Sequence, residues 1–168
     1  MEGNNIRIVL IGVLAAVMLL FGCPAFLHQD DACISLVHHF FHANIFHLAV
    51  NCFSIWSLFR RGVRYTVLPL ILAFIIATLS WFCTSADAVG FSNIIFATVG
   101  LRTPSLKHEW WRGRPVIIFL SVNALMLLLP QVSAVTHIVS FALGSVVAGA
   151  ARLYKSIRRD YSRAAYCR

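Results

Sequence analysis

Charged residues are scarce in this chain of 168 residues. Only 12% of the residues are charged and 60% are hydrophobic, whereas a soluble domain is about 25% charged and about 45–50% apolar. Acidic residues are the rarest, with six Asp and Glu against 14 Lys and Arg. This composition excludes an ordinary soluble domain and predicts a protein that crosses a membrane several times.

The apolar segments do not alternate apolar with polar residues and are longer than the strands of a membrane barrel. Because lipid cannot satisfy open backbone groups, only helices remain. We expect an all-α membrane protein, a six-transmembrane-helix bundle forming one domain over residues 1–168. Its fourth helix is too short to span alone and must be enclosed by its neighbours. The expected helices are 8–22, 44–59, 67–83, 92–101, 116–129 and 135–151, followed by a basic cytoplasmic tail at 152–168.

Paired cysteine motifs are also missing. None of the five cysteines forms a CxxC pair, so we expect no metal site and no cofactor. Cys23 and Cys33 fall in or beside one outer loop, and a disulfide between them is a hypothesis.

Lysine and arginine are absent from three expected loops, 24–41, 84–89 and 130–134. All 14 lie in the N-terminal flank, the other two loops or the tail. Because basic residues stay on the cytoplasmic side of a membrane, this pattern predicts that both termini are cytoplasmic. It also accounts for the net charge of +8, so we do not expect the protein to bind nucleic acid. We place this integral multi-pass protein in the plasma (inner) membrane.

The first apolar segment has two interpretations. Leu20-Phe21-Gly22-Cys23 weakly resembles a lipoprotein cleavage site, which favours a signal peptide. Only Arg7 supplies a positive flank, and Phe21 is atypical at its position. We favour a retained helix.

Polar residues occur at one depth of the expected bundle. His47 and Asn51 are four residues apart on the second helix and therefore share a face. Ser92 begins the fourth helix, and His137 lies near the start of the sixth. The topology places all four in one layer, a little below the outer membrane surface. Each alone is explained by hydrogen bonding between helices, but together they are candidates for function.

A serine and a histidine in this layer predict nucleophilic catalysis. Serine is a weak nucleophile and needs an adjacent base, which is usually histidine. His47, Asn51 and the backbone N–H of Ser92 are the candidate donors for the oxyanion of a tetrahedral intermediate. Asp87 is the only carboxylate nearby, which favours a Ser–His dyad over a triad.

Small residues follow His137 along the sixth helix. Ser140, Gly144 and Ala148 lie at spacings of three, four and four, which places them on the His137 face. Such a stripe lets another helix approach closely. The expected partner is the helix that carries Ser92, with its own Ala97 and Gly100.

These residues resemble the motifs of the rhomboid family of intramembrane serine proteases, over nearly the whole chain. His42-xxxx-His47-xxx-Asn51 is similar to the family's HxxxxHxxxN pattern, and Gly90-Phe91-Ser92 to the first three positions of GxSG. His137 and Gly144 resemble the histidine and distal glycine of the last helix.

The resemblance implies the minimal six-helix form and a serine endopeptidase with Ser92 as nucleophile and His137 as base. It implies an oxyanion site of His47, Asn51 and the Ser92 amide, and His42 as support for the loop above. The implied partners are the lipid bilayer and transmembrane substrate proteins, cut near the outer end of a helix.

Two positions depart from the family pattern, because Asn93 replaces the last glycine of GxSG and Ser140 replaces a glycine after His137. Asn93 adds a side chain beside the nucleophile. The alternative function is therefore that of a catalytically inactive relative that binds membrane-protein clients. A transporter or channel ranks last, because the sequence has no inverted repeat and no charged residue within an expected helix.

Overall fold

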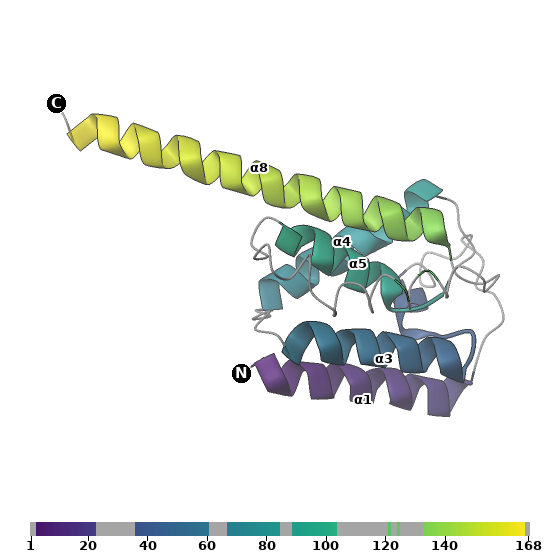
Figure 1. The fold of residues 1–168 in the computed structure, drawn as a ribbon. Coiled ribbons are helices and arrows are strands. Elements are labelled where there is room, and N and C mark those ends of the chain that lie inside the picture. The colour runs from purple at the N-terminus through teal and green to yellow at the C-terminus, as the bar shows by residue number, and fades with distance from the viewer. Residues whose placement is uncertain are drawn as a thin grey trace.

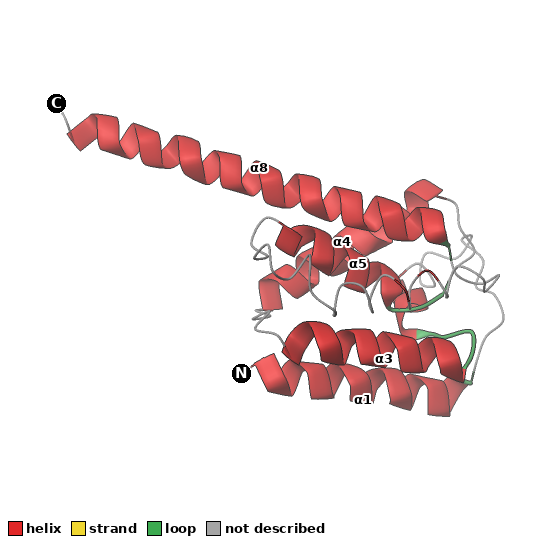
Figure 2. Ribbon diagram, viewed as in Figure 1, coloured by secondary structure: helices red, strands yellow, loops and turns green. Residues whose placement is uncertain are grey.

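The computed structural model describes residues 3–22, 36–60, 67–84, 89–103, 121, 124 and 133–166. Every regular element in these ranges is helical, as expected for an all-α fold (Figure 2). The predicted helix at 116–129, apart from positions 121 and 124, lies outside the described residues, as does the pairing of Cys23 with Cys33. The elements are α1 (Gly3–Phe21), the 3-10 helix η1 (His38–Phe40), α3 (Ile45–Arg60), α4 (Val67–Thr84), α5 (Ser92–Arg102) and α8 (Ala134–Tyr166).

Helix α5 lies at the centre of the arrangement. It packs against α8 and α4 on one side and contacts α3 on the other, while α1 covers α3 (Figure 1). All residues of α5 from Ser92 to Gly100 are buried except Phe96, which is half-buried. The apolar core surrounds this helix and is formed by Leu14, Leu48, Ile55, Ala73, Ile76, Ala77, Phe91, Ile94, Ile95, Ala97 and Val99. An 11-residue helix is about 16 Å long, so its neighbours rather than lipid enclose it.

Local sequence signals set the helix ends. Gly22, at φ 73°, ends α1 and donates its N–H to the carbonyl of Met18 at 2.9 Å, which is the usual use of a glycine after a helix. The Asn44 side-chain oxygen accepts the N–H of His47 at 2.9 Å and caps α3. Ser133 accepts the N–H of Thr136 at 3.2 Å at the start of α8.

Two helices are longer than predicted. Helix α1 begins at Gly3 rather than near residue 8, and the Arg7 guanidinium lies 4.0 Å from the centre of the Trp56 ring on α3. This cation–π contact packs the polar first turns against the neighbouring helix. Helix α8 continues through the predicted basic tail to Tyr166. After Gly149 the segment has no glycine or proline and is rich in Ala and Arg, which favour helix.

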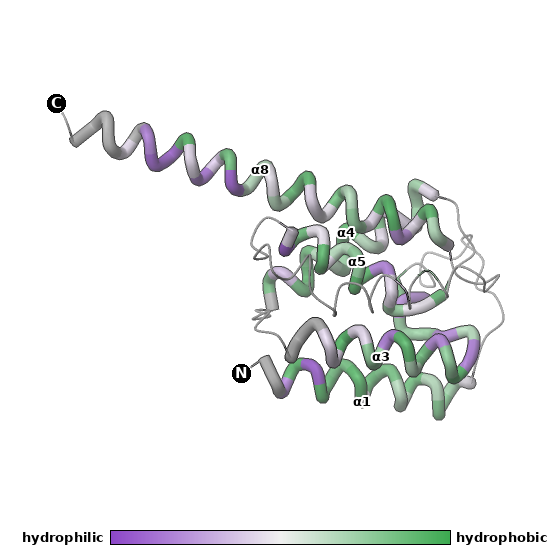
Figure 3. Tube along the Cα trace, in the orientation of Figure 1, coloured by the Kyte–Doolittle hydropathy of each residue, from purple (hydrophilic) through white to green (hydrophobic). Residues whose placement is uncertain are grey.

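The outer faces of the helices are apolar. Ile45, Phe46, Leu68, Val135 and Ile138 are among the large apolar side chains that remain exposed. Apolar residues dominate every α-helix in the described ranges except the C-terminal part of α8 (Figure 3). Among the described residues, Ala134–Asp160 is long and apolar enough to cross a membrane. Asn5–Phe21, Ile45–Ser57 and Leu68–Thr84 are apolar but shorter.

Candidate active site

Ser92 and His137 lie side by side in the interior. Ser92 is the first residue of α5, and His137 lies in the first turn of α8. The His137 Nε2 atom is 2.7 Å from the Ser92 Oγ atom, a hydrogen-bond distance between residues 45 apart in sequence. The two side chains are 6% and 4% exposed. A serine hydroxyl in contact with a neutral imidazole has the arrangement of a nucleophile and its base.

The His137 ring is held by an aromatic side chain. It stacks on Phe96 of α5, with ring centres 4.5 Å apart and an angle of 14° between the planes. The other ring nitrogen, Nδ1, is buried and has no hydrogen-bond partner. Within the described residues, therefore, no carboxylate bonds to this histidine, and the stacking on Phe96 restrains the plane of its ring.

Gly90 makes the turn that leads into α5. Its φ of 127° is a conformation that other residues rarely adopt. A Cβ atom at this position would lie 2.6 Å from Cε1 and 2.8 Å from Nε2 of His47, and 3.5 Å from Nδ2 of Asn51. Only glycine fits here, because both the backbone conformation and the space exclude a side chain.

The same distances place two polar side chains beside the turn. His47 Nε2 and Asn51 Nδ2 face Gly90, two residues before Ser92, and both atoms are buried with no hydrogen-bond partner among the described residues. At the start of α5, the N–H groups of Ile94 and Ile95 donate to the Phe91 carbonyl at 3.1 and 3.2 Å, whereas those of Ser92 and Asn93 come too early in the helix to find an acceptor within it. His47, Asn51 and the start of α5 thus meet at the Gly90 turn, two residues before Ser92.

His42 supports this group from the connection before α3. Its ring meets the His47 ring edge to face, with centres 5.2 Å apart. Burial, with a smaller contribution from His47, lowers the pKa of His42 to about 3. His42 therefore stays uncharged at any physiological pH, as its packing against a second histidine requires.

Sequence reasoning missed His38, His39 and Trp81. The His38 carbonyl accepts the Gly90 N–H at 3.2 Å, and its ring stacks on Trp81 at 4.1 Å. His39 lies 3.1 Å from the Thr78 hydroxyl through Nε2. These residues tie η1 to α4 and hold the Gly90 turn. The available signal was the spacing of His38, four residues before His42.

The remaining predicted residues lie on the contact between α5 and α8 or beside it. Gly144 and Gly100 touch directly, since a Cβ on Gly144 would lie 2.5 Å from the Ala97 carbonyl oxygen and 3.2 Å from Gly100 Cα. Ser140 is fully buried on α8, and Asn93 is 3% exposed. In the part of the chain that the structure describes, neither the Ser140 hydroxyl nor the Asn93 side-chain oxygen has a hydrogen-bond partner. The small-residue stripe thus lets the two helices meet backbone to backbone.

Two further features bear on ligands. A cavity of about 220 Å³ lies beside the first turn of α5. Its lining is wholly apolar: Leu10, Phe40, Leu70, Ile71, Phe74, Phe91 and Ile94. The described residues contain no group of three or more His, Cys, Asp or Glu suited to a metal ion.

Comparison with known proteins gives the family. Residues 32–153, which include every motif above, match the model of the rhomboid domain. Comparisons with curated proteins and with solved structures gave no match. The match covers most of the chain, so this protein belongs to the rhomboid family, whose members are embedded in membranes and are generally serine proteases.

Proposed function

We propose that this protein is an intramembrane serine endopeptidase that cleaves transmembrane helices of other proteins with a Ser92–His137 dyad. The observation that carries the proposal is the 2.7 Å contact between Ser92 Oγ and His137 Nε2 in a buried site. Cleavage of a reporter helix by the protein reconstituted into lipid vesicles tests it.

The geometry supports a two-step mechanism. His137 Nε2 takes the Ser92 proton as Oγ attacks the carbonyl carbon of the scissile bond. The oxyanion of the tetrahedral intermediate accepts hydrogen bonds from His47, Asn51 and the Ser92 N–H. The intermediate collapses when His137 returns the proton to the leaving amine, and water then hydrolyses the acyl-enzyme by the same route.

Loss of an oxyanion donor is expected to slow cleavage without unfolding the protein. In His47→Ala and Asn51→Ala, kcat should fall about a hundredfold to a thousandfold, because each change removes a donor that acts mainly in the transition state. Kinetics on the reporter helix measure this. Ser57→Ala, at a half-buried position on the same helix, is the control and should leave kcat unchanged. Full activity in both donor variants would contradict the proposed oxyanion site.

Activity is expected to fall in acid. His137 accepts a proton only when neutral, so protonation of its imidazole at low pH removes the base, and the rate rises with pH until the ring is fully deprotonated. His42 does not complicate the profile, because its pKa of about 3 keeps it neutral. Initial rates from pH 4 to 8 in vesicles measure the profile. A rate that rises as the pH is lowered across this range would argue against His137 as the base.

The proposed setting is an integral multi-pass protein with six crossings in the plasma (inner) membrane. The support is the segregation of all 14 Lys and Arg to one side of the expected helices. Both termini are then cytoplasmic, and the dyad lies near the outer surface. The proposed partners are transmembrane substrate proteins and the lipid bilayer, with no metal or organic cofactor.

The alternative is a catalytically inactive relative that binds membrane-protein clients. Asn93 is the observation that favours it, since this position departs from GxSG and its side chain is buried next to Ser92. A client-binding protein would hold a substrate helix equally well after Ser92→Ala and would release no cleaved product.

A further inference from the structure

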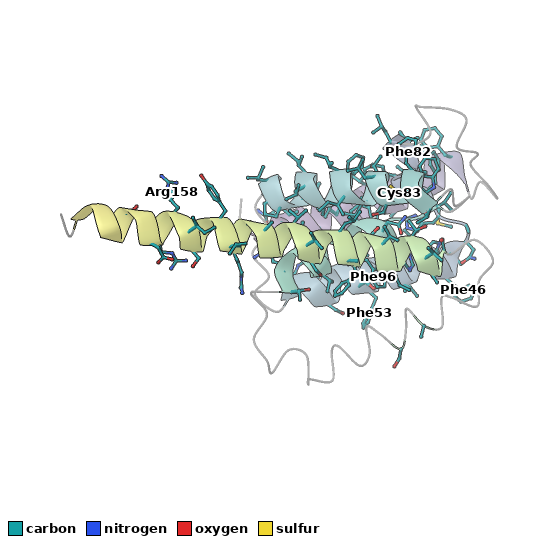
Figure 4. The ribbon with its side chains drawn as sticks, turned by 90° about the horizontal axis from the view of Figure 1, so that it is seen from above. Phe46, Phe53, Phe82, Cys83, Phe96 and Arg158 are labelled. Carbon is teal, nitrogen blue, oxygen red and sulfur yellow. The ribbon has the colours of Figure 1, made fainter. Side chains whose placement is uncertain are left out.

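The C-terminal part of α8 stands clear of the rest of the described molecule (Figure 1). Every residue from Gly149 to Asp160 is exposed. In the view of Figure 4 this segment, which carries Arg158, extends beyond the ends of the other helices. Residues 153–160 thus form a regular helix whose side chains are exposed and pack against no other helix in the described part of the chain.

This segment has two faces of different chemistry. Residues turn by about 100° along a helix, so Leu153 and Ile157 lie on one face with Tyr154 beside them. Arg152, Lys155 and Arg159 lie on the opposite face, where the Arg159 Nε donates to the Lys155 carbonyl at 3.4 Å. We call Arg152, Lys155, Arg158 and Arg159 the basic cluster. Asp160 is the only acidic residue between 149 and 160.

The basic cluster begins where the apolar part of α8 ends. Residues 134–151 contain no Lys, Arg, Asp or Glu, and at 1.5 Å per residue they extend about 27 Å. This length matches the hydrocarbon core of a bilayer, about 30 Å thick. Val135, Ile138 and Val146, at 61–67% exposure, present apolar surface along this part. Arg152 therefore falls at the level of the lipid headgroups.

We propose that the basic cluster binds anionic phospholipid headgroups of the cytoplasmic leaflet. Lys155, Arg158 and Arg159 lie within two turns of Arg152, and their long side chains reach back to the phosphates. Leu153 and Tyr154 lie at the boundary of core and headgroups, where apolar and tyrosine side chains are favoured. The proposal rests on the membrane orientation given above and is independent of catalysis.

Hydrogen–deuterium exchange of the full-length protein in nanodiscs tests this. A short helical extension whose side chains are exposed, as they are from 153 to 160, is only marginally stable in water, so residues 152–166 should exchange fast in discs of phosphatidylcholine. In discs that also contain phosphatidylglycerol, exchange should slow about tenfold or more, because each basic residue gains attraction to the anionic surface. High salt should reverse the protection. Equal exchange in both kinds of disc would overturn the proposal.

Charge variants identify the residues responsible. The triple variant Lys155→Gln, Arg158→Gln, Arg159→Gln should exchange fast in both kinds of disc. The control Asp160→Asn keeps the basic cluster and should retain the protection. Protection that survives in the triple variant would overturn the proposal. Protection in neutral discs that appears only with two protein copies per disc would also overturn it, because the segment would then bind a second copy of the protein.

Discussion

Ser92→Ala and His137→Ala are each expected to abolish labelling of the reconstituted protein by a fluorophosphonate probe. The probe reacts only with an activated serine, and activation here depends on the 2.7 Å contact between Ser92 Oγ and His137 Nε2. Removing either member of such a unit costs about a thousandfold or more in rate. Quantified fluorescence of the labelled band, beside cleavage of the reporter helix, measures the loss.

A second buried serine is the control for this experiment. Ser80 is fully buried in α4, and its hydroxyl donates to the Ile76 carbonyl at 2.7 Å. Ser80→Ala should keep full labelling. Labelling that persists in Ser92→Ala would show that another residue reacts, and labelling that persists only in His137→Ala would exclude His137 as base. If the folded wild-type protein is not labelled, Asn93→Gly tests whether the departure from GxSG is the cause.

Gly144→Ala is expected to lower the activity strongly, although Gly144 does not contact Ser92 or His137, and to destabilise the fold. The new Cβ would lie 2.5 Å from the Ala97 carbonyl oxygen and 3.0 Å from the Leu101 backbone nitrogen. Neither atom is the end of a flexible side chain, so α8 must move away from α5. Displacement of His137 from Ser92 by about 1 Å is enough to lower the rate about a hundredfold. Such overpacking also lowers the free energy of unfolding by about 1–3 kcal/mol.

The measurements are probe labelling, reporter cleavage and thermal unfolding in detergent. Gly149→Ala is the matched control, because it lies on the same helix and a Cβ there meets nothing within 4 Å. It should keep full activity and slightly stabilise α8, since alanine favours helix over glycine. Equal activity of Gly144→Ala and Gly149→Ala would show that the contact between α5 and α8 does not position the dyad.

Gly144 and Gly90 show how much of the site can be predicted from the sequence. The spacing of His137, Ser140 and Gly144 places small residues on one face, and this predicts close packing. It also predicts the partner helix, with Ala97 and Gly100, and the structure confirms this contact, because a Cβ on Gly144 would lie 2.5 Å from the Ala97 carbonyl oxygen and 3.2 Å from Gly100 Cα. Gly90 likewise matches a motif, but its φ of 127° and the positions of His47 and Asn51 beside it depend on where η1 anchors the turn.

Composition and motif order were enough to predict an all-α membrane protein of the rhomboid family, because lipid leaves few alternatives for the backbone and the motifs occur along most of the chain. Helix ends could also be predicted, because capping residues such as Asn44 and Gly22 act on backbone groups only a few residues away.

Contacts between residues distant in sequence could not be read in this way. Phe96 stacks on His137 across 41 positions, and His38 holds Gly90 across 52. Such contacts depend on how the helices pack, which the residues adjacent in sequence do not determine. The helical conformation of the basic tail could not be predicted for a different reason. A basic segment after a membrane span has the same composition whether it is a coil or a helix.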